Sequence, residues 1–119
     1  MIRVKRVHDP LEPGDGPRFL VDRLWPRGIK KEDLPMDGWF RAVAPSDELR
    51  RWFGHEPAKW TDFCYRYHAE LEGKSEVWRP LLDLARQQDI TLLFSAHDPE
   101  RNNAVALKLF LEEQLKSGR

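Results

Sequence analysis

The feature that most constrains the fold is an uninterrupted apolar run, Ile-Thr-Leu-Leu-Phe-Ser, at residues 90–95. Such a run, starting on β-branched residues, predicts a central strand that is buried on both faces of a sheet. Asp98 and Pro99 follow closely and predict the N-cap and first position of a helix that runs to about Lys116. A buried strand that leads into a capped helix is half of a βαβ unit, which favours an α/β layer fold.

Two further strands are predicted before this one. Residues 2–7 alternate apolar and charged side chains, which is typical of a half-exposed strand, and residues 19–21 predict a short buried strand. Residues 39–44 are apolar but too short to assign to helix or strand.

The middle of the chain is predicted to be helical. Ser46 is a good N-cap for a helix over 47–53, and a longer helix is predicted after Pro57, ending at Gly73. The next helix is predicted to start near Arg79, because Pro80 would lie too deep in a helix that began earlier.

These elements predict the fold class and the domain organisation. With 119 residues, the chain suits one small domain over 1–119. We expect a three-layer α/β domain in which a short, mostly parallel sheet is flanked by about four to five helices. No apolar run approaches the length of a membrane span, no signal-like segment occurs at the N-terminus, and one cysteine cannot form an internal disulfide. We therefore expect a cytoplasmic protein with no membrane association.

Polar side chains follow the ends of two predicted strands. Asp22, Arg23 and Arg27 come after the strand at 19–21, and Asp98 comes after the strand at 90–95. Ligands bind at the carboxyl ends of strands in open α/β sheets, and arginines there favour phosphate or carboxylate groups. The sequence therefore predicts a site for an anionic small molecule and leaves open whether a reaction occurs. No metal site or cofactor motif is found.

Roles in this site are predicted for three kinds of residue. Arg23, Arg27 and Arg50 would hold the anion. Asp22 or Asp98 would orient the arginines or act as a base, and His55 is the best candidate for proton transfer. Each aspartate also has a structural alternative, a salt bridge with a neighbouring arginine for Asp22 and helix capping for Asp98.

Two other classes of function are kept open. Twenty basic residues balance twenty acidic ones, which disfavours a general nucleic-acid binder, although the first 31 residues hold eight basic and only four acidic side chains. A nucleic-acid-associated or regulatory module would use cations at Arg3, Lys5, Arg6, Arg18, Lys30 and Lys31. A protein-interaction domain would instead use exposed tryptophans at positions 25, 39 and 52.

The chain resembles a known bacterial family. The run Phe-Leu-Val-Asp-Arg-Leu-Trp-Pro-Arg-Gly-Ile at 19–29 is similar to the signature of YeaO-like proteins, domain of unknown function 488, and the similarity continues through Trp-Phe-Gly-His at 52–55 and Leu-Phe-Ser-Ala at 93–96. The resemblance implies a small α/β domain without an assigned activity. It also marks Arg66, Tyr67 and Asn102 as ligand-binding candidates. His97 and Asn103 depart from the family pattern, in which lysine and histidine are usual.

Overall fold

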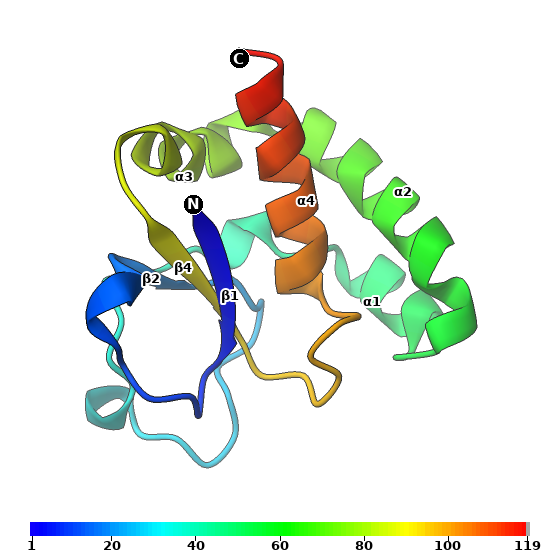
Figure 1. Cartoon of the computed structure of the whole chain (residues 1–119). Helices are drawn as coiled ribbons and strands as arrows, with labels where there is room; N and C mark the ends of the chain where they lie inside the picture. The colour runs from blue at the N-terminus through cyan, green and yellow to red at the C-terminus, as the bar shows by residue number, and fades with distance from the viewer. Residues whose placement is uncertain (119) are drawn as a thin grey trace.

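The computed structural model describes residues 1–118, which are built around a four-stranded parallel sheet (Figure 1). The strands are β1 (Ile2–Arg6), β2 (Arg18–Leu20), β3 (Gly38–Trp39) and β4 (Ile90–Phe94), and their order across the sheet is β1-β4-β2-β3. Every neighbouring pair is parallel. The carboxyl ends of the strands therefore meet at one edge of the sheet, which we call the carboxyl edge.

β4 is the strand that the apolar run predicted. All five of its residues are buried. Leu92 and Phe94 belong to the larger hydrophobic core on one face, and Leu93 belongs to a smaller core on the other. The prediction of a strand buried on both faces is confirmed. The strand predicted at 19–21 is β2, one residue earlier, although the Val21 N–H still donates to the Leu93 carbonyl at 3.1 Å.

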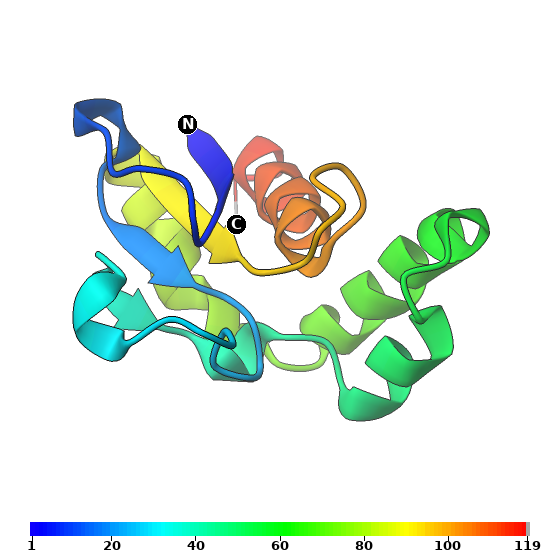
Figure 2. The ribbon, with the colours of Figure 1, turned by 90° about the horizontal axis from the view of Figure 1, so that it is seen from below.

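The two faces of the sheet are covered differently (Figure 2). Four helices, α1 (Asp47–Phe53), α2 (Trp60–Glu72), α3 (Ser75–Gln87) and α4 (Asn103–Lys116), contribute buried residues to the larger core. The smaller core is closed by irregular chain that carries Leu34, Trp25 and Met36. The predicted α/β class with a parallel sheet is confirmed, with helices on one face and loops and 3-10 turns on the other.

The first two helices begin and end where the sequence predicted. The Ser46 side chain accepts a hydrogen bond from the Leu49 N–H, and Gly54 ends α1 in the left-handed conformation at φ 55°. A 3-10 turn that begins at Pro57 leads into α2, which ends before Gly73.

The predicted start of the third helix is wrong. α3 begins at Ser75, and Pro80 lies inside it. Proline lacks an N–H, so one helical hydrogen bond is lost there. The Pro80 side chain points to solvent while Trp78 and Leu81 are buried, and this burial offsets the lost bond.

The predicted start of the last helix is also wrong. α4 begins at Asn103, and its N-cap is Asn102, whose side chain accepts from the Val105 N–H at 2.9 Å. Asp98 caps a separate turn instead, because its Oδ1 accepts from the backbone N–H groups two and three residues further on. Both positions carry a cap-forming side chain, and the chain uses both in succession.

Charged side chains from the first 18 residues form a largely buried cluster beside the sheet. Asp15 is 2% exposed and Arg18 is 1% exposed, and their side chains pair at 2.6 Å. Lys5 Nζ contacts Asp15 at 3.1 Å and Glu12 at 2.8 Å. Burial raises the pKa of Asp15, but hydrogen bonds from Arg18 and Lys5 outweigh it and leave the pKa below its ordinary value. We call Lys5, Asp15 and Arg18 the buried charge cluster.

Candidate functional site

The ends of β2 and β4 meet at the carboxyl edge through Asp22. Ser95, directly after β4, donates two hydrogen bonds to Asp22 Oδ2, from its backbone N–H at 2.9 Å and from its hydroxyl at 2.7 Å. The Asn103 amide donates to Asp22 Oδ1 at 3.1 Å. These bonds form because β2 and β4 are parallel neighbours, as the sequence predicted. Asp22 makes no salt bridge with Arg23 or Arg27, so the structural alternative for this residue is wrong.

Arg23 extends from the same strand end toward the start of α1. Its guanidinium donates to the carbonyls of Ala44 and Pro45 at 3.2–3.3 Å. Asp47, in the first turn of α1, lies 3.6 Å from Arg23 and 2.8 Å from Arg50. Arg23 therefore joins the sheet edge to α1 and is fixed in position.

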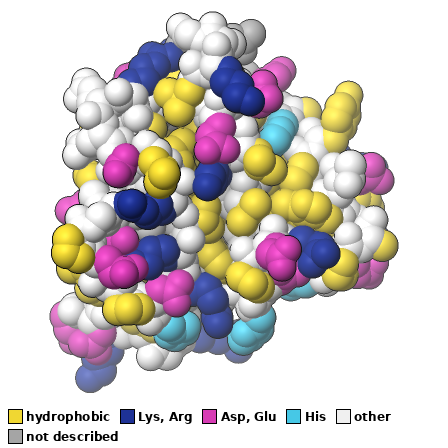
Figure 3. Space-filling view, in the orientation of Figure 1, with side chains coloured by type: hydrophobic (Ala, Val, Ile, Leu, Met, Phe, Trp, Pro, Cys, Tyr) yellow, Lys and Arg dark blue, Asp and Glu magenta, His cyan; other side chains and the backbone are white. Residues whose placement is uncertain are grey.

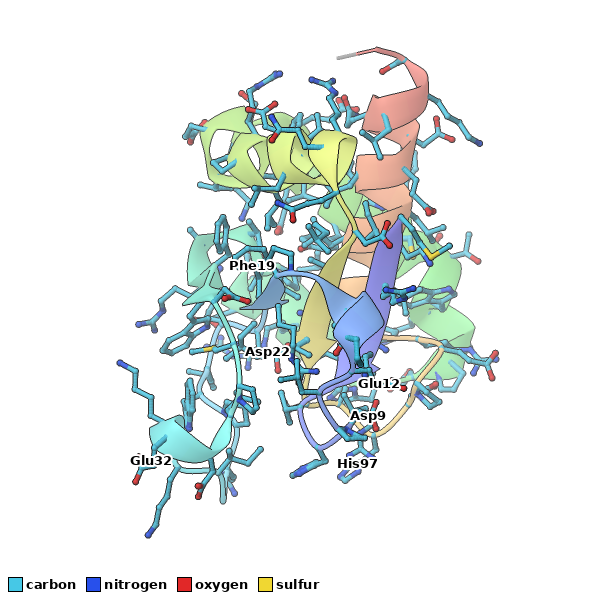
Figure 4. The ribbon with its side chains drawn as sticks, turned by 60° about the vertical axis from the view of Figure 1, so that its left-hand side comes forward. Asp9, Glu12, Phe19, Asp22, Glu32 and His97 are labelled. Carbon is cyan, nitrogen blue, oxygen red and sulfur yellow. The ribbon has the colours of Figure 1, made fainter. Side chains whose placement is uncertain are left out.

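A cavity of about 600 Å³ opens over this region. Its polar lining is dominated by cationic and titratable nitrogen groups: Arg6, Arg23, Arg27, Arg50, Arg51, His8, His55 and His97. Asp22 is the one carboxylate that lines it among residues 1–118. Figure 4 shows Asp22 and His97 toward the same end of the sheet, and Figure 3 shows histidines beside Lys or Arg side chains along the lower edge of the molecule. We call this cavity the arginine pocket.

Several of these cations lack an anionic partner within the part of the chain that the structure describes. Arg27 and Arg51 are exposed and form no ion pair with residues 1–118. Arg6 has a buried Nε that finds no hydrogen-bond acceptor among the described residues. The positive charge of the arginine pocket is therefore largely uncompensated by protein carboxylates.

Apolar side chains form another part of the wall, among them Trp25, Pro26, Phe53 and Phe63. The Trp25 ring is fixed by a 2.7 Å hydrogen bond from its indole N–H to the Ile29 carbonyl. Low-dielectric walls of this kind strengthen the field of nearby charges. The pocket can therefore offer one ligand both ionic and apolar contacts.

His55 stands at the rim in an unusual backbone conformation. Its φ is 59°, and it is the one non-glycine residue with a positive φ among residues 1–118. Such conformations cost free energy and gather at functional sites. The ring is exposed to solvent and lies 6.1 Å, centroid to centroid, from Phe53.

Three of the predicted site residues lie outside the arginine pocket. Asp98 does not line it, and the backbone N–H groups of its own turn hold the pKa of that carboxyl below its ordinary value. The Tyr67 hydroxyl is buried and donates to the Val43 carbonyl, and burial raises its pKa. Arg66 stacks over the Trp52 ring at 4.3 Å. The structure therefore gives all three a structural explanation.

The other predicted site residues do line the pocket: Asp22, Arg23, Arg27, Arg50, His55 and Asn102. Sequence reasoning did not place Arg6, His8 or Arg51 in this site. Arg6 ends β1, and the parallel-sheet rule that selected Asp22 would have selected it too. Arg51 follows Arg50 in the short helix and had no separate signal.

Some of the residues assigned to the two alternative functions are engaged within the fold. Trp25, Trp39 and Trp52 are half-buried, and the first two pack against each other at 5.6 Å. Of the cations assigned to nucleic acid, Arg18 is buried and Lys5 is engaged by two carboxylates.

No group of three or more His, Cys, Asp or Glu side chains within 1–118 is arranged to hold a metal ion. In the same range, none of the helices has the length and apolar character needed to cross a membrane.

The chain is similar to one protein-family model and to several bacterial proteins. A family model described as "Inactive DUF488-N3 subclade" matches residues 1–119. The Escherichia coli (strain K12) protein called "Uncharacterized protein YeaO" is 47% identical over 106 residues, which cover 89% of this chain and 92% of the relative. An uncharacterised Mycobacterium tuberculosis (strain H37Rv) protein is 37% identical over 110 residues, covering 92% of each chain. No solved structure matches.

Proposed function

Because the chain belongs to the DUF488 family, in the subclade described as inactive, we propose that it binds a small anionic molecule at the arginine pocket without transforming it. The ligand carries phosphate or carboxylate. The word "inactive" in the family description supports binding over catalysis.

One observation carries the proposal: five arginines and one carboxylate line the same cavity. Asp47 lies near two of these arginines and Asp22 lines the cavity, so positive charge is in excess there and remains available to an anion from solution. A charge-assisted hydrogen bond to an oxyanion contributes about 1.5–3 kcal/mol, so even two or three of them would support measurable binding. The volume of about 600 Å³ fits a small-molecule site.

The arrangement of the titratable groups also favours binding. Both oxygens of Asp22 accept hydrogen bonds from Ser95 and Asn103, so this carboxylate is held in place by the fold. Asp98 is engaged in its own turn and does not line the pocket. Asp22 and His55 both line the pocket, but among residues 1–118 no hydrogen bond joins their side chains, and Asp98 lies outside the lining.

Calorimetric titration with inorganic phosphate tests the proposal. Arg50→Gln is the test variant and Arg86→Gln is its matched control, because each arginine forms an ion pair with an aspartate three residues earlier in its helix, Asp47 and Asp83 respectively. Both variants remove one positive charge, but only Arg50 lines the arginine pocket.

We expect phosphate to bind the native chain, to bind Arg50→Gln about tenfold more weakly, and to bind Arg86→Gln as it binds the native chain. Parallel titrations with sulfate and succinate distinguish phosphate-like from carboxylate ligands. The proposal would be contradicted if none of the three anions bound the native chain. It would also be contradicted if Arg50→Gln and Arg86→Gln lost the same amount of phosphate affinity.

A further inference from the structure

Six of the eight arginines and histidines that line the arginine pocket fall into two groups that come from different elements. Arg23, Arg50 and Arg51 lie at or beside α1, and we call them the α1 group. Arg6 is the last residue of β1, His8 follows β1 and His97 follows β4, and we call these three the β1 group.

The α1 group is held together by a shared contact. Arg23 and Arg50 approach the same Asp47 oxygen, at 3.6 Å and 2.8 Å. Asp47 is more than half exposed and does not line the pocket, so it holds the two guanidiniums near each other without occupying the cavity. Arg51, the next residue of the helix, adds a third cation without any anionic partner among residues 1–118.

The β1 group is assembled by the sheet. Arg6 is paired in register with Phe94, the last residue of β4, and His97 follows three residues later. Adjacent parallel strands lie about 4.8 Å apart, so the residues that follow β1 and β4 leave the sheet side by side. Arg6 keeps a buried Nε that no acceptor within 1–118 satisfies. Arg6 also lines the arginine pocket, so this group brings one permanent cation and two histidines to it.

Asp22 separates the two groups. It follows β2, which is two strand spacings, about 10 Å, from β1 in the order β1-β4-β2-β3. Its carboxylate accepts a hydrogen bond from Ser95 at the end of β4, and the next residue, Arg23, reaches Asp47 at the start of α1. An anion placed directly against Asp22 would be repelled, whereas a hydroxyl or amine could donate to it. The charge along the carboxyl edge is therefore positive, negative and positive in turn.

This alternation points to a more specific ligand, and the inference rests on the proposed function. We infer that the arginine pocket recognises a molecule with two anionic groups, such as a bisphosphate, joined by a segment that donates a hydrogen bond or is neutral. One anionic group contacts the α1 group and the other contacts the β1 group. The segment that joins them passes Asp22.

The test compares ligands that differ only in the second anionic group. Pentane-1,5-diol bisphosphate and pentyl phosphate are titrated by calorimetry into the native chain, Arg6→Gln and Arg50→Gln, with Arg86→Gln as the charge-matched control. Circular dichroism establishes that each variant is folded. His97→Gln, at an exposed position, is the second probe of the β1 group if Arg6→Gln does not fold.

The native chain is expected to bind the bisphosphate at least about tenfold more tightly than pentyl phosphate. Arg6→Gln is expected to weaken the bisphosphate about tenfold and to leave pentyl phosphate unchanged, because the single phosphate binds the α1 group. Arg50→Gln is expected to weaken both ligands.

Two results would overturn the inference and leave the proposed function standing. One is equal affinity of the native chain for the two ligands, and the other is an equal loss of both ligands in Arg6→Gln. If neither ligand binds the native chain, both the inference and the proposed function are contradicted.

Discussion

The chain places arginines in two very different settings. In the buried charge cluster, Arg18 is 1% exposed, and Asp15 and Glu12 balance the charges of Arg18 and Lys5. In the arginine pocket, five arginines share one lining carboxylate, and Asp47 partly balances two of them from outside. In the first setting Asp15 and Arg18 are buried and the charges are balanced once Glu12 is counted, whereas the second setting is partly open and carries an excess of positive charge.

The difference separates two uses of the same side chain. A buried arginine with its own carboxylate joins parts of the fold, here the loop that contains Asp15 to β2 and, through a 2.9 Å bond from Arg18 Nε, to the Pro35 carbonyl. Arginines without protein carboxylates remain able to bind an anion from solution. The predictions below change one side of this comparison at a time.

The largest effect is expected from Asp15→Asn. This change leaves Arg18 buried without its counter-charge, and losing one partner of a buried ion pair destabilises proteins by about 3–5 kcal/mol. Urea denaturation followed by circular dichroism measures the free energy of unfolding. Glu12→Gln is the matched control, because the Glu12 side chain is 66% exposed and its loss should cost less than about 1 kcal/mol. Equal effects of the two changes would show that the cluster is not a buried, paired unit.

Acid titration should give the same cluster a pH signature. The folded-state pKa of Asp15 is lowered, so its contribution to stability is present above the ordinary aspartate value of about 3.9 and is lost as pH falls through the lower folded value. The free energy of unfolding, measured at a series of pH values below 5, should therefore fall more gently in Asp15→Asn than in the native chain. Parallel curves would contradict the assignment.

A change of opposite sign is expected in the pocket from Asp22→Asn. Removing its one lining carboxylate removes a repulsion, so phosphate should bind about fivefold more tightly, a gain of about 1 kcal/mol. Calorimetry under conditions where circular dichroism shows an intact fold gives the affinity. Weaker phosphate binding in Asp22→Asn would mean that the carboxylate supports the anion site by positioning its neighbours.

The smallest effect on stability is expected from Arg51→Gln. Arg51 is exposed and lacks an anionic partner within 1–118, so the free energy of unfolding should change by no more than about 0.5 kcal/mol. Phosphate affinity should still fall, because the pocket loses a cation. A stability loss comparable to that of Asp15→Asn would place Arg51 among the structural arginines.

Local patterns in the sequence were sufficient to predict β4 and the limits of α1. The run at 90–95 predicted β4 because burial on both faces requires continuous apolar residues, and Ser46 with Gly54 predicted the limits of α1. The start of α4 was missed because Asp98 and Asn102 are equally good caps, and only the folded chain decides which one begins the helix.

The site was predicted in part for a similar reason. Strand adjacency brought Asp22 to Ser95, as the parallel-sheet rule indicates, but the position of α1 over the sheet edge depends on long-range packing. The burial of Arg18 was also beyond local pattern, since arginine is usually exposed. The sequence could therefore predict where the strands end, but not which arginines would be left unpaired.

The most direct test of the account is to map where phosphate binds by amide NMR. Titration of inorganic phosphate into the ¹⁵N-labelled chain should shift the backbone signals of Asp22, Ser95, Asn103 and the last turn of α1, and leave those of Asp15 and Arg18 in place. That pattern would establish the arginine pocket as the anion site and the buried charge cluster as structural. Shifts centred on the buried charge cluster, or no localised shifts at all, would contradict the distinction between the two settings.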